Sequence, residues 1–364
     1  MKLSEIIAPI EELAPLAYQE SYDNSGLLIG HSSMKVKSAL LCIDVTEEVI
    51  DEALSLNANL IIAHHPLIFS GIKRFTGHSA TERLVMKAIK NDVAVYAAHT
   101  NLDSVTGGVN SKICEKLGLK KCRVLAPVAG QLRKLVTFVP NGQVEKVRKA
   151  IFEAGAGNIG EYDQCSYNVE GHGTFRGSEN TDPYVGKPGE LHIEEETRIE
   201  TIFPAIYQAK VIKALLNAHP YEEVAYDVYP LENSSEKVGM GMIGELDTAE
   251  EEDVFLTALK DIFKIPVIRH SPLLGKPIQK VAVCGGSGSF LIQKAISANA
   301  DAFLTGDMKY HQFFEAENRV IIADIGHYES EQFTKEIFYD LLTKKFPNFA
   351  VHLSKIVSNP INYL

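Results

Sequence analysis

The feature that most limits the fold is a repeated order of apolar strand, polar strand end and helix in the first and last thirds of the chain. Leu60–Ala63 ends at His64, and Val93–Ala98 ends at His99. Such short, unbroken apolar runs are typical of strands that helices cover on both faces. The same order returns after Lys280–Cys284, Ala302–Leu304 and Val320–Ala323. The pattern predicts an α/β domain made of two similar halves.

The middle of the chain follows a different pattern. Pro127 and Gly130 mark one boundary, and Pro230 with the polar run 232–236 marks the other. The segment between them, about 100 residues, is long enough for a small domain. Its order of strand, helix, strand, strand, helix and strand predicts a ferredoxin-like α+β domain. We therefore expect residues 1–128 and 233–364 to form one split α/β domain, into which residues 129–232 are inserted.

The charge of the chain limits its partners. Lys and Arg number 36 and Asp and Glu number 47, which gives a net charge of −11. An acidic surface argues against bulk binding of nucleic acid or anionic membranes. The first residues turn acidic at Glu5, and no apolar run approaches a membrane span, so we expect neither a signal peptide nor a membrane protein. Five cysteines without a C-x-x-C pair indicate buried thiols in a reducing cytoplasm.

Histidine and aspartate gather where the apolar strands end. His64 and His65 follow one strand, and Asp103 lies in the polar loop after the next. Ligands of open α/β sheets bind outside the carboxyl ends of the strands, and imidazole is the commonest metal ligand. Taken singly, the two histidines also fit an exposed loop, and Asp103 also fits a turn or helix cap.

His327 and Glu331 add a second group of ligand-type side chains. They lie four residues apart, which places them on one face of a helix that begins near Gly326. Two residues with this spacing can bind one metal ion together. The alternative is a charged helix N-terminus, where the helix dipole favours the carboxylate.

Together the five predicted ligands exceed the needs of a single four-coordinate zinc site with an open position. They suit two metal ions that share a bridging carboxylate or water. We expect two divalent ions and choose zinc first, while iron, manganese, cobalt and nickel fit the same mixture of nitrogen and oxygen ligands.

Two further segments contain candidate substrate-binding residues. Gly286, Ser287 and Gly288 lie between a strand and a helix, where backbone N–H groups can hold a phosphate, although a tight turn without a ligand fits equally well. Asp307, Lys309 and His311 follow another strand end and suit substrate binding or proton transfer, or the capped start of a helix.

Several motifs in this order resemble those of the Nif-three-like family, whose bacterial members are called GTP cyclohydrolase I type 2 homologues. They are Tyr22–Gly26, Ala63–Pro66, His99–Asp103, Thr305–His311 and Gly326–Glu331. The insertion resembles the domain of the nitrogen-regulatory and divalent-cation-tolerance proteins, most clearly at His219–Glu223. The resemblance covers the whole chain.

The resemblance implies a dinuclear metal centre in a toroidal homohexamer. The family's metal ligands correspond to His64, His65, Asp103, His327 and Glu331 of this sequence. The implied activity is a metal-dependent hydrolase of the GTP cyclohydrolase I type 2 kind, acting on a purine nucleotide. We expect His99 and His311 to transfer protons, and Lys309 and the segment 286–288 to hold the triphosphate. The alternative is a non-catalytic metal-binding assembly, a metallochaperone or a regulatory protein.

Overall fold

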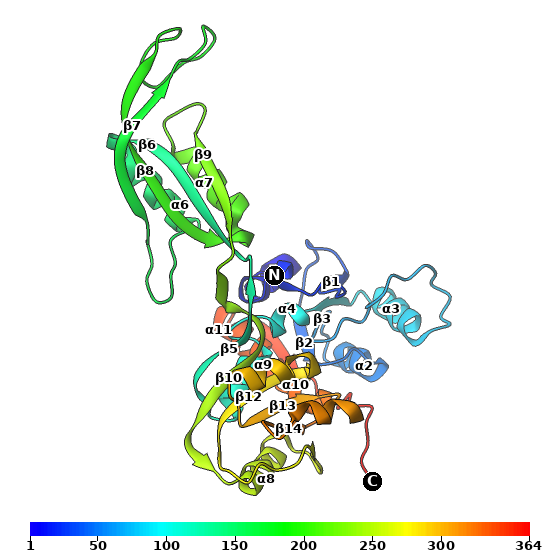
Figure 1. Ribbon diagram of the computed structural model, residues 1–364. Coiled ribbons are helices and arrows are strands. Elements are labelled where there is room, and N and C mark those ends of the chain that lie inside the picture. Colours follow the sequence, from blue (N-terminus) through cyan, green and yellow to red (C-terminus); the bar gives the residue numbers. More distant parts are fainter. The chain divides into compact units, whose positions relative to one another are not determined.

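The computed structural model describes residues 1–364, and the contacts within the chain divide it into two compact units. The first unit joins Met1–Pro127 to Lys237–Leu364, and the second comprises Val128–Glu236. The chain has three sheets and many helices, so the predicted α/β class is confirmed. Figure 1 shows the elements of both units.

The first unit contains a five-stranded sheet with the order β1-β4-β3-β2-β15. Strands β2, β3 and β4 run parallel, β15 runs parallel to β2, and β1 is an antiparallel edge strand. The strands span Gly26–Ile29 (β1), Ser38–Cys42 (β2), Leu60–Ala63 (β3), Ala94–Ala97 (β4) and Ala350–Leu353 (β15).

A second sheet of the same unit has six strands in the order β11-β14-β13-β12-β10-β5. Its parallel centre of β12, β13 and β14 repeats the arrangement of β2, β3 and β4. The strands span Lys120–Ala129 (β5), Ser234–Glu250 (β10), Arg269–His270 (β11), Ile278–Ser287 (β12), Ala302–Gly306 (β13) and Ile321–Asp324 (β14). Each sheet therefore takes one strand from the other half of the chain, β15 in the first and β5 in the second.

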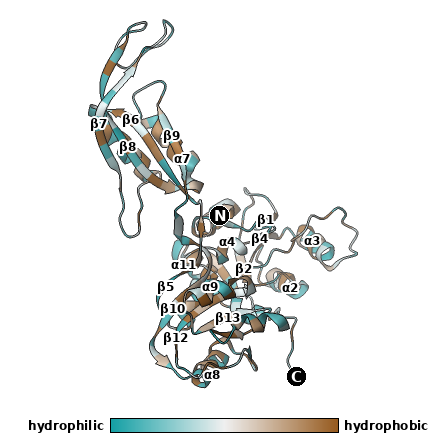
Figure 2. Cartoon of the chain, in the orientation of Figure 1, coloured by the Kyte–Doolittle hydropathy of each residue, from teal (hydrophilic) through white to brown (hydrophobic).

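Local sequence explains where the helices of this unit begin. The Thr46 hydroxyl accepts a hydrogen bond from the Val49 amide, and the Ser79 hydroxyl accepts one from the Glu82 amide, so both residues cap a helix. The helices are α1 (Leu3–Leu13), α2 (Glu47–Ser55), α3 (Ala80–Lys90), α4 (Thr100–Asp103), α5 (Val109–Lys116), α8 (Glu252–Phe263), α9 (Ile292–Ser297), α10 (His327–Glu331) and α11 (Thr334–Lys345), with short 3₁₀ turns η1 (Leu16–Tyr18), η4 (Ser289–Leu291) and η5 (Tyr310–Ala316). In Figure 2 these helices carry both hydrophobic and hydrophilic residues, because one side of each faces the core.

One hydrophobic core joins the two sheets of the first unit. Leu41 and Tyr96 from the first sheet share this cluster with Val283 and Leu304 from the second, and Phe338 of α11 belongs to it. All five side chains are buried. The two halves of the sequence therefore stabilise each other and form one unit.

The second unit has one antiparallel four-stranded sheet in the order β7-β8-β6-β9. Two helices pack on one face of it, as Figure 1 shows. The chain order is β6 (Leu132–Pro140), η2 (Asn141–Gln143), α6 (Val144–Glu153), β7 (Tyr167–Phe175), β8 (His192–Pro204), η3 (Ala205–Tyr207), α7 (Gln208–Ala218) and β9 (Tyr226–Leu231). The small core between the sheet and the helices includes Leu135, Val139, Ile199 and Leu215.

No helix in the structure has both the length and the apolar character that crossing a membrane requires.

We predict that Phe338→Ala will destabilise the first unit by about 3–5 kcal/mol, because the substitution leaves a cavity in the shared core. Tyr339→Ala is the matched control, since this neighbour on α11 is partly exposed. The measurement is urea unfolding followed by circular dichroism. Equal losses in the two variants would contradict a core shared by both sheets.

Candidate metal centre

The carboxyl ends of strands from both sheets supply the side chains of one polar cluster. His64 and His65 follow β3, and Asp103 ends α4, the short helix after β4. His327 and Glu331 are the first and last residues of α10, which follows β14 of the other sheet. These five residues are the ones that the sequence predicts as metal ligands. Three of them follow strands of the first sheet and two follow a strand of the second, so distant parts of the chain contribute to one cluster.

Glu331 lies at the centre of the cluster and is 2 % exposed. One carboxylate oxygen, Oε1, lies 3.5 Å from His64 Nε2. The other, Oε2, lies 2.9 Å from His65 Nε2 and 3.2 Å from His327 Nε2. The ligand atoms of His64, His65 and Glu331 all lie within 4.8 Å of one another, a grouping that could hold a metal ion. Each oxygen of this carboxylate therefore faces a different set of imidazoles.

Two buried atoms of the cluster have no hydrogen-bond partner. They are His64 Nε2 and Asp103 Oδ1, which lie 3.8 Å apart. An unpartnered polar atom inside a protein costs free energy, and such atoms are rare in native structures. A cation between this nitrogen and this oxygen would satisfy both atoms, so the residues present fit a metal ion.

The other ring nitrogens are held by the protein. His64 Nδ1 donates to the carbonyl oxygen of Ala98 at 2.9 Å. His65 Nδ1 donates to Asp44 and His327 Nδ1 donates to Asp307, each at 2.7 Å. These bonds orient the rings and direct each Nε2 into the cluster, which is the usual support for metal-binding histidines.

The electrostatics show that the cluster holds protons when no metal is bound. Burial lowers the pKa of His65 and His327, but hydrogen bonds to carboxylates outweigh it and raise these pKa values to about 9 and about 11. Burial and the charge of Glu331 raise the pKa of Asp103 to about 7, against the effect of His64. The pKa of Glu331 is lowered despite burial, because His64, His327 and His65 surround it. A metal ion must displace these protons in order to bind.

His99, the predicted proton-transfer residue, lies beside the cluster. Its ring centre is 5.4 Å from those of His64 and His65. His99 Nδ1 donates to Asp23 at 2.7 Å, and the hydroxyl of Thr100 also donates to this carboxylate. Burial raises the pKa of Asp23, but the hydrogen bonds from His99 and Thr100 outweigh it and lower the pKa well below its usual range. Asp23 therefore stays ionised and orients His99.

Three aspartates orient the histidines, and the sequence pointed to only one of them, Asp307, as a candidate for substrate binding or proton transfer. Asp44 and Asp307 do follow strands β2 and β13, the same signal that pointed to His64. Asp23 lies in a loop before β1, within a segment singled out only through its family resemblance. Strand-end position identified Asp307 and could also have identified Asp44, but not Asp23.

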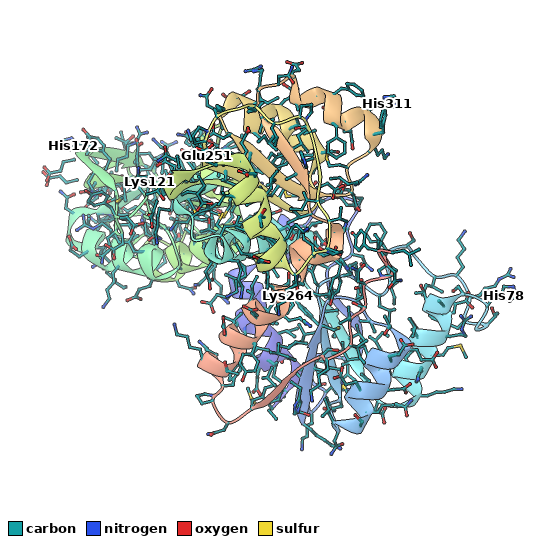
Figure 3. All side chains as sticks on the ribbon, turned by 90° about the horizontal axis from the view of Figure 1, so that it is seen from below. His78, Lys121, His172, Glu251, Lys264 and His311 are labelled. Carbon is teal, nitrogen blue, oxygen red and sulfur yellow. The ribbon has the colours of Figure 1, made fainter.

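The remaining predicted residues lie outside the metal cluster, with one exception. His311 and Lys309 are exposed, and the His311 ring contacts Tyr310 and Phe314 on η5. Figure 3 shows the His311 side chain at the outer edge of its segment. Ser287 is exposed at the end of β12. The roles predicted for these residues stay predictions.

The exception is Gly286. The backbone N–H groups of Gly286 and Gly288 are both hydrogen-bonded within the protein. The Gly288 amide donates to the Thr305 hydroxyl and the Gly286 amide donates to the Ser330 hydroxyl, both at 2.9 Å, so neither N–H is free. Gly286 has φ of +62°, and a Cβ there would overlap Glu331 Oε1. Gly286 therefore makes room for the central carboxylate of the cluster.

Comparison with known proteins identifies the relatives of this chain. Residues 1–360 match the family model described as Duf34/NIF3 (NGG1p interacting factor 3). A Halalkalibacterium halodurans protein named "GTP cyclohydrolase 1 type 2 homolog" is 41% identical over 364 residues, covering 99% of this chain and 98% of the relative. A Bacillus subtilis protein of the same name is 39% identical, with the same coverage.

Solved structures agree with these sequence relatives. A Bacillus cereus protein related to NIF3 has 42% identity and a TM-score of 0.88, and the match covers 100% of this chain and 99% of that one. A Staphylococcus aureus protein has 28% identity and a TM-score of 0.80 with the same coverage.

We predict that the metal-free protein loses stability as pH rises from 6 to 10. The raised pKa values of His65 and His327 mean that their protonated forms stabilise the fold fully below about pH 6.5. This stabilisation, about 3 kcal/mol for His65 alone, fades as pH rises through about 9 and 11. The measurement is the Tm with a chelator present. His327→Gln should flatten the dependence and exposed His78→Gln should leave it unchanged. A Tm that rises over this range would contradict the prediction.

Added zinc should raise the Tm more at pH 8 than at pH 6, because fewer protons then compete with the metal for the histidine ligands.

We predict that Gly286→Ala weakens zinc binding by about 10- to 100-fold, although residue 286 supplies no ligand atom, because the new methyl group displaces Glu331. Gly118→Ala is the matched control, since Gly118 also has a positive φ, of +68°, but open space around it. Competition with a chromophoric chelator gives both affinities. Unchanged zinc affinity in Gly286→Ala would show that Glu331 tolerates displacement.

Proposed function

This chain belongs to the Duf34/NIF3 family, and we propose on that basis that it binds two divalent metal ions and hydrolyses a purine nucleotide. The observation that carries the proposal is the buried Glu331 carboxylate, whose two oxygens face different histidines. The name "GTP cyclohydrolase 1 type 2 homolog" of the relatives supports GTP as the first substrate to test.

The cluster offers two sets of ligands, which supports two ions rather than one. The first set is His64, Asp103 and Glu331 Oε1. The second is His65, His327 and Glu331 Oε2. Zinc is our first choice, and iron, manganese, cobalt or nickel suit the same ligand types. When bound, such ions supply Lewis-acid activation of water and of the bond under attack.

The protein's own residues would orient the site and move protons. Asp44 and Asp307 hold the rings of His65 and His327. His99, fixed by ionised Asp23, lies at the edge of the cluster and is partly exposed, as a group that exchanges protons with a substrate must be. In a cyclohydrolase reaction, water adds to the imidazole carbon of guanine, and formate is released. We propose His99 as the residue that transfers a proton in this reaction.

The proposed substrate surface joins two exposed segments of the first unit. Gln312 Nε2 donates to the Ser289 hydroxyl at 2.8 Å, which links η5 to the turn after Gly288. Lys309 and His311 belong to the same segment as Gln312, which this bond connects to the residues after Gly288. We propose that Lys309 and Ser287 hold the triphosphate, which a lysine ammonium attracts as a point charge, and that His311 is a second candidate for proton transfer.

The proposal also includes the fold type of the unit Val128–Glu236 and the number of chains in the assembled protein. The unit's chain order, strand-helix-strand-strand-helix-strand, and its sheet order β9-β6-β8-β7 support its assignment as ferredoxin-like. A homohexamer and a cytoplasmic location stay proposals, and the mass of the protein in solution tests the first.

We expect the metal-loaded protein to contain two ions per chain and to release formate from GTP. Glu331→Gln and His64→Ala should lose metal and lower the rate by 100-fold or more, while His78→Ala, an exposed histidine, serves as the control. Elemental analysis and a formate assay are the measurements. Two bound ions without formate release, with zinc, manganese, iron or cobalt and beside an active control enzyme, would reject the hydrolase and favour a non-catalytic metal-binding assembly.

A further inference from the structure

The second unit, Val128–Glu236, contains a cavity of about 610 Å³ that the proposed function does not use. This volume lies within the range of small-molecule sites in proteins. All of its lining residues belong to the second unit, so the cavity is complete within this part of the chain.

Strand register places the cavity on the sheet face that the helices leave open. Phe138 pairs with Arg198, and Gly171 pairs with Glu196. Side chains alternate between the two faces of a strand, so these positions point away from Val139 and Ile199, which pack against the helices. The segments 176–184 and 221–225 complete the wall on the open face.

Glu196 is the unusual residue of this cavity. It lines the space, is 8 % exposed, and accepts a hydrogen bond from the Tyr221 hydroxyl at 2.7 Å. No lysine, arginine or histidine of the chain forms an ion pair with it. Burial of a carboxylate without a cationic partner is costly. Glu196 therefore fits a ligand that brings its own positive charge.

Gly173 keeps the space that this carboxylate occupies. A Cβ at position 173 would overlap Glu196 Oε2. The glycine lies on β7 opposite Glu194, and its lack of a side chain lets the carboxylate lie against the strand. The position of Glu196 is thus supported by the neighbouring strand as well as by Tyr221.

Aromatic rings form the rest of the wall. The Tyr221 ring centre lies 5.9 Å from Phe175 and 6.2 Å from Tyr184, and all three residues line the cavity. Aromatic faces attract cations, and they also pack against the apolar body of a ligand. The charged residues of the wall are mostly acidic. The wall contains four glutamates, Glu170, Glu196, Glu222 and Glu223, and two arginines, Arg176 and Arg198.

A bare metal ion suits this site poorly. No three His, Cys, Asp or Glu ligand atoms of the second unit lie within 4.8 Å of one another. Arg198 is already paired with Glu200 at 2.8 Å, so it does not neutralise Glu196. We propose that this cavity binds a small organic ammonium ion, with the charged nitrogen on Glu196 and the apolar body against Phe175, Tyr184 and Tyr221.

Calorimetric titration of the full chain with benzylammonium tests the proposal. We expect saturable binding at one site per chain, and at least tenfold weaker binding of benzyl alcohol, which has a similar shape without the charge. Glu196→Gln should weaken benzylammonium binding at least tenfold. Glu195→Gln is the matched control, since this exposed neighbour on β8 carries the same charge and does not line the cavity.

Tyr221→Phe provides a second variant in case Glu196→Gln does not fold, which circular dichroism would reveal. It removes the hydroxyl that orients Glu196 and should weaken binding about threefold or more. Three results would overturn the proposal: equal binding of benzyl alcohol, equal losses in Glu195→Gln and Glu196→Gln, or no saturable binding of benzylammonium. If the third result comes with a change of mass in solution for Glu196→Gln, a second copy of the chain fills the cavity.

Discussion

The buried carboxylate of Glu331 is the group on which the arrangement of the first unit depends. It lies against His64 and His65 at the end of β3 and against His327 on its own helix. These contacts connect residues that lie 266 positions apart in the chain. A charge buried this deeply is tolerated only where cationic or hydrogen-bonding partners surround it. The two sheets must therefore bring their carboxyl ends together, and the shared core holds them there.

Much of this arrangement is encoded locally and is predictable from the sequence. Apolar runs such as Leu60–Ala63 indicate buried strands, and the α/β class follows from their alternation with helices. Because strand ends gather at one edge of a sheet, His64, His65 and Asp103 are predictable as neighbours. The sequence does not predict that β5 joins the second sheet and β15 the first, because no local pattern distinguishes one pairing partner from another.

The glycines at the end of β12 show where the local pattern becomes ambiguous. A strand followed by glycines and a helix is typical both of an anion site and of a close approach between chain segments. What distinguishes the two here is the position of Ser330 and Glu331, which the sequence around Gly286 does not contain. The direction of the His311 side chain is likewise not predictable, because its position in a motif does not determine how η5 orients the ring.

The placement of β15 has a consequence for the protein's synthesis on the ribosome. Strand β2 is made early, but its parallel neighbour Ala350–Leu353 emerges only after the whole second sheet. Beyond β15, the Ser358 hydroxyl reaches back to Asp44, the residue that orients His65. A nascent chain therefore exposes His64 and His65 for most of translation without the partners that would complete their surroundings. Domains fold as units during synthesis, and this unit is closed only by the strand that is translated late.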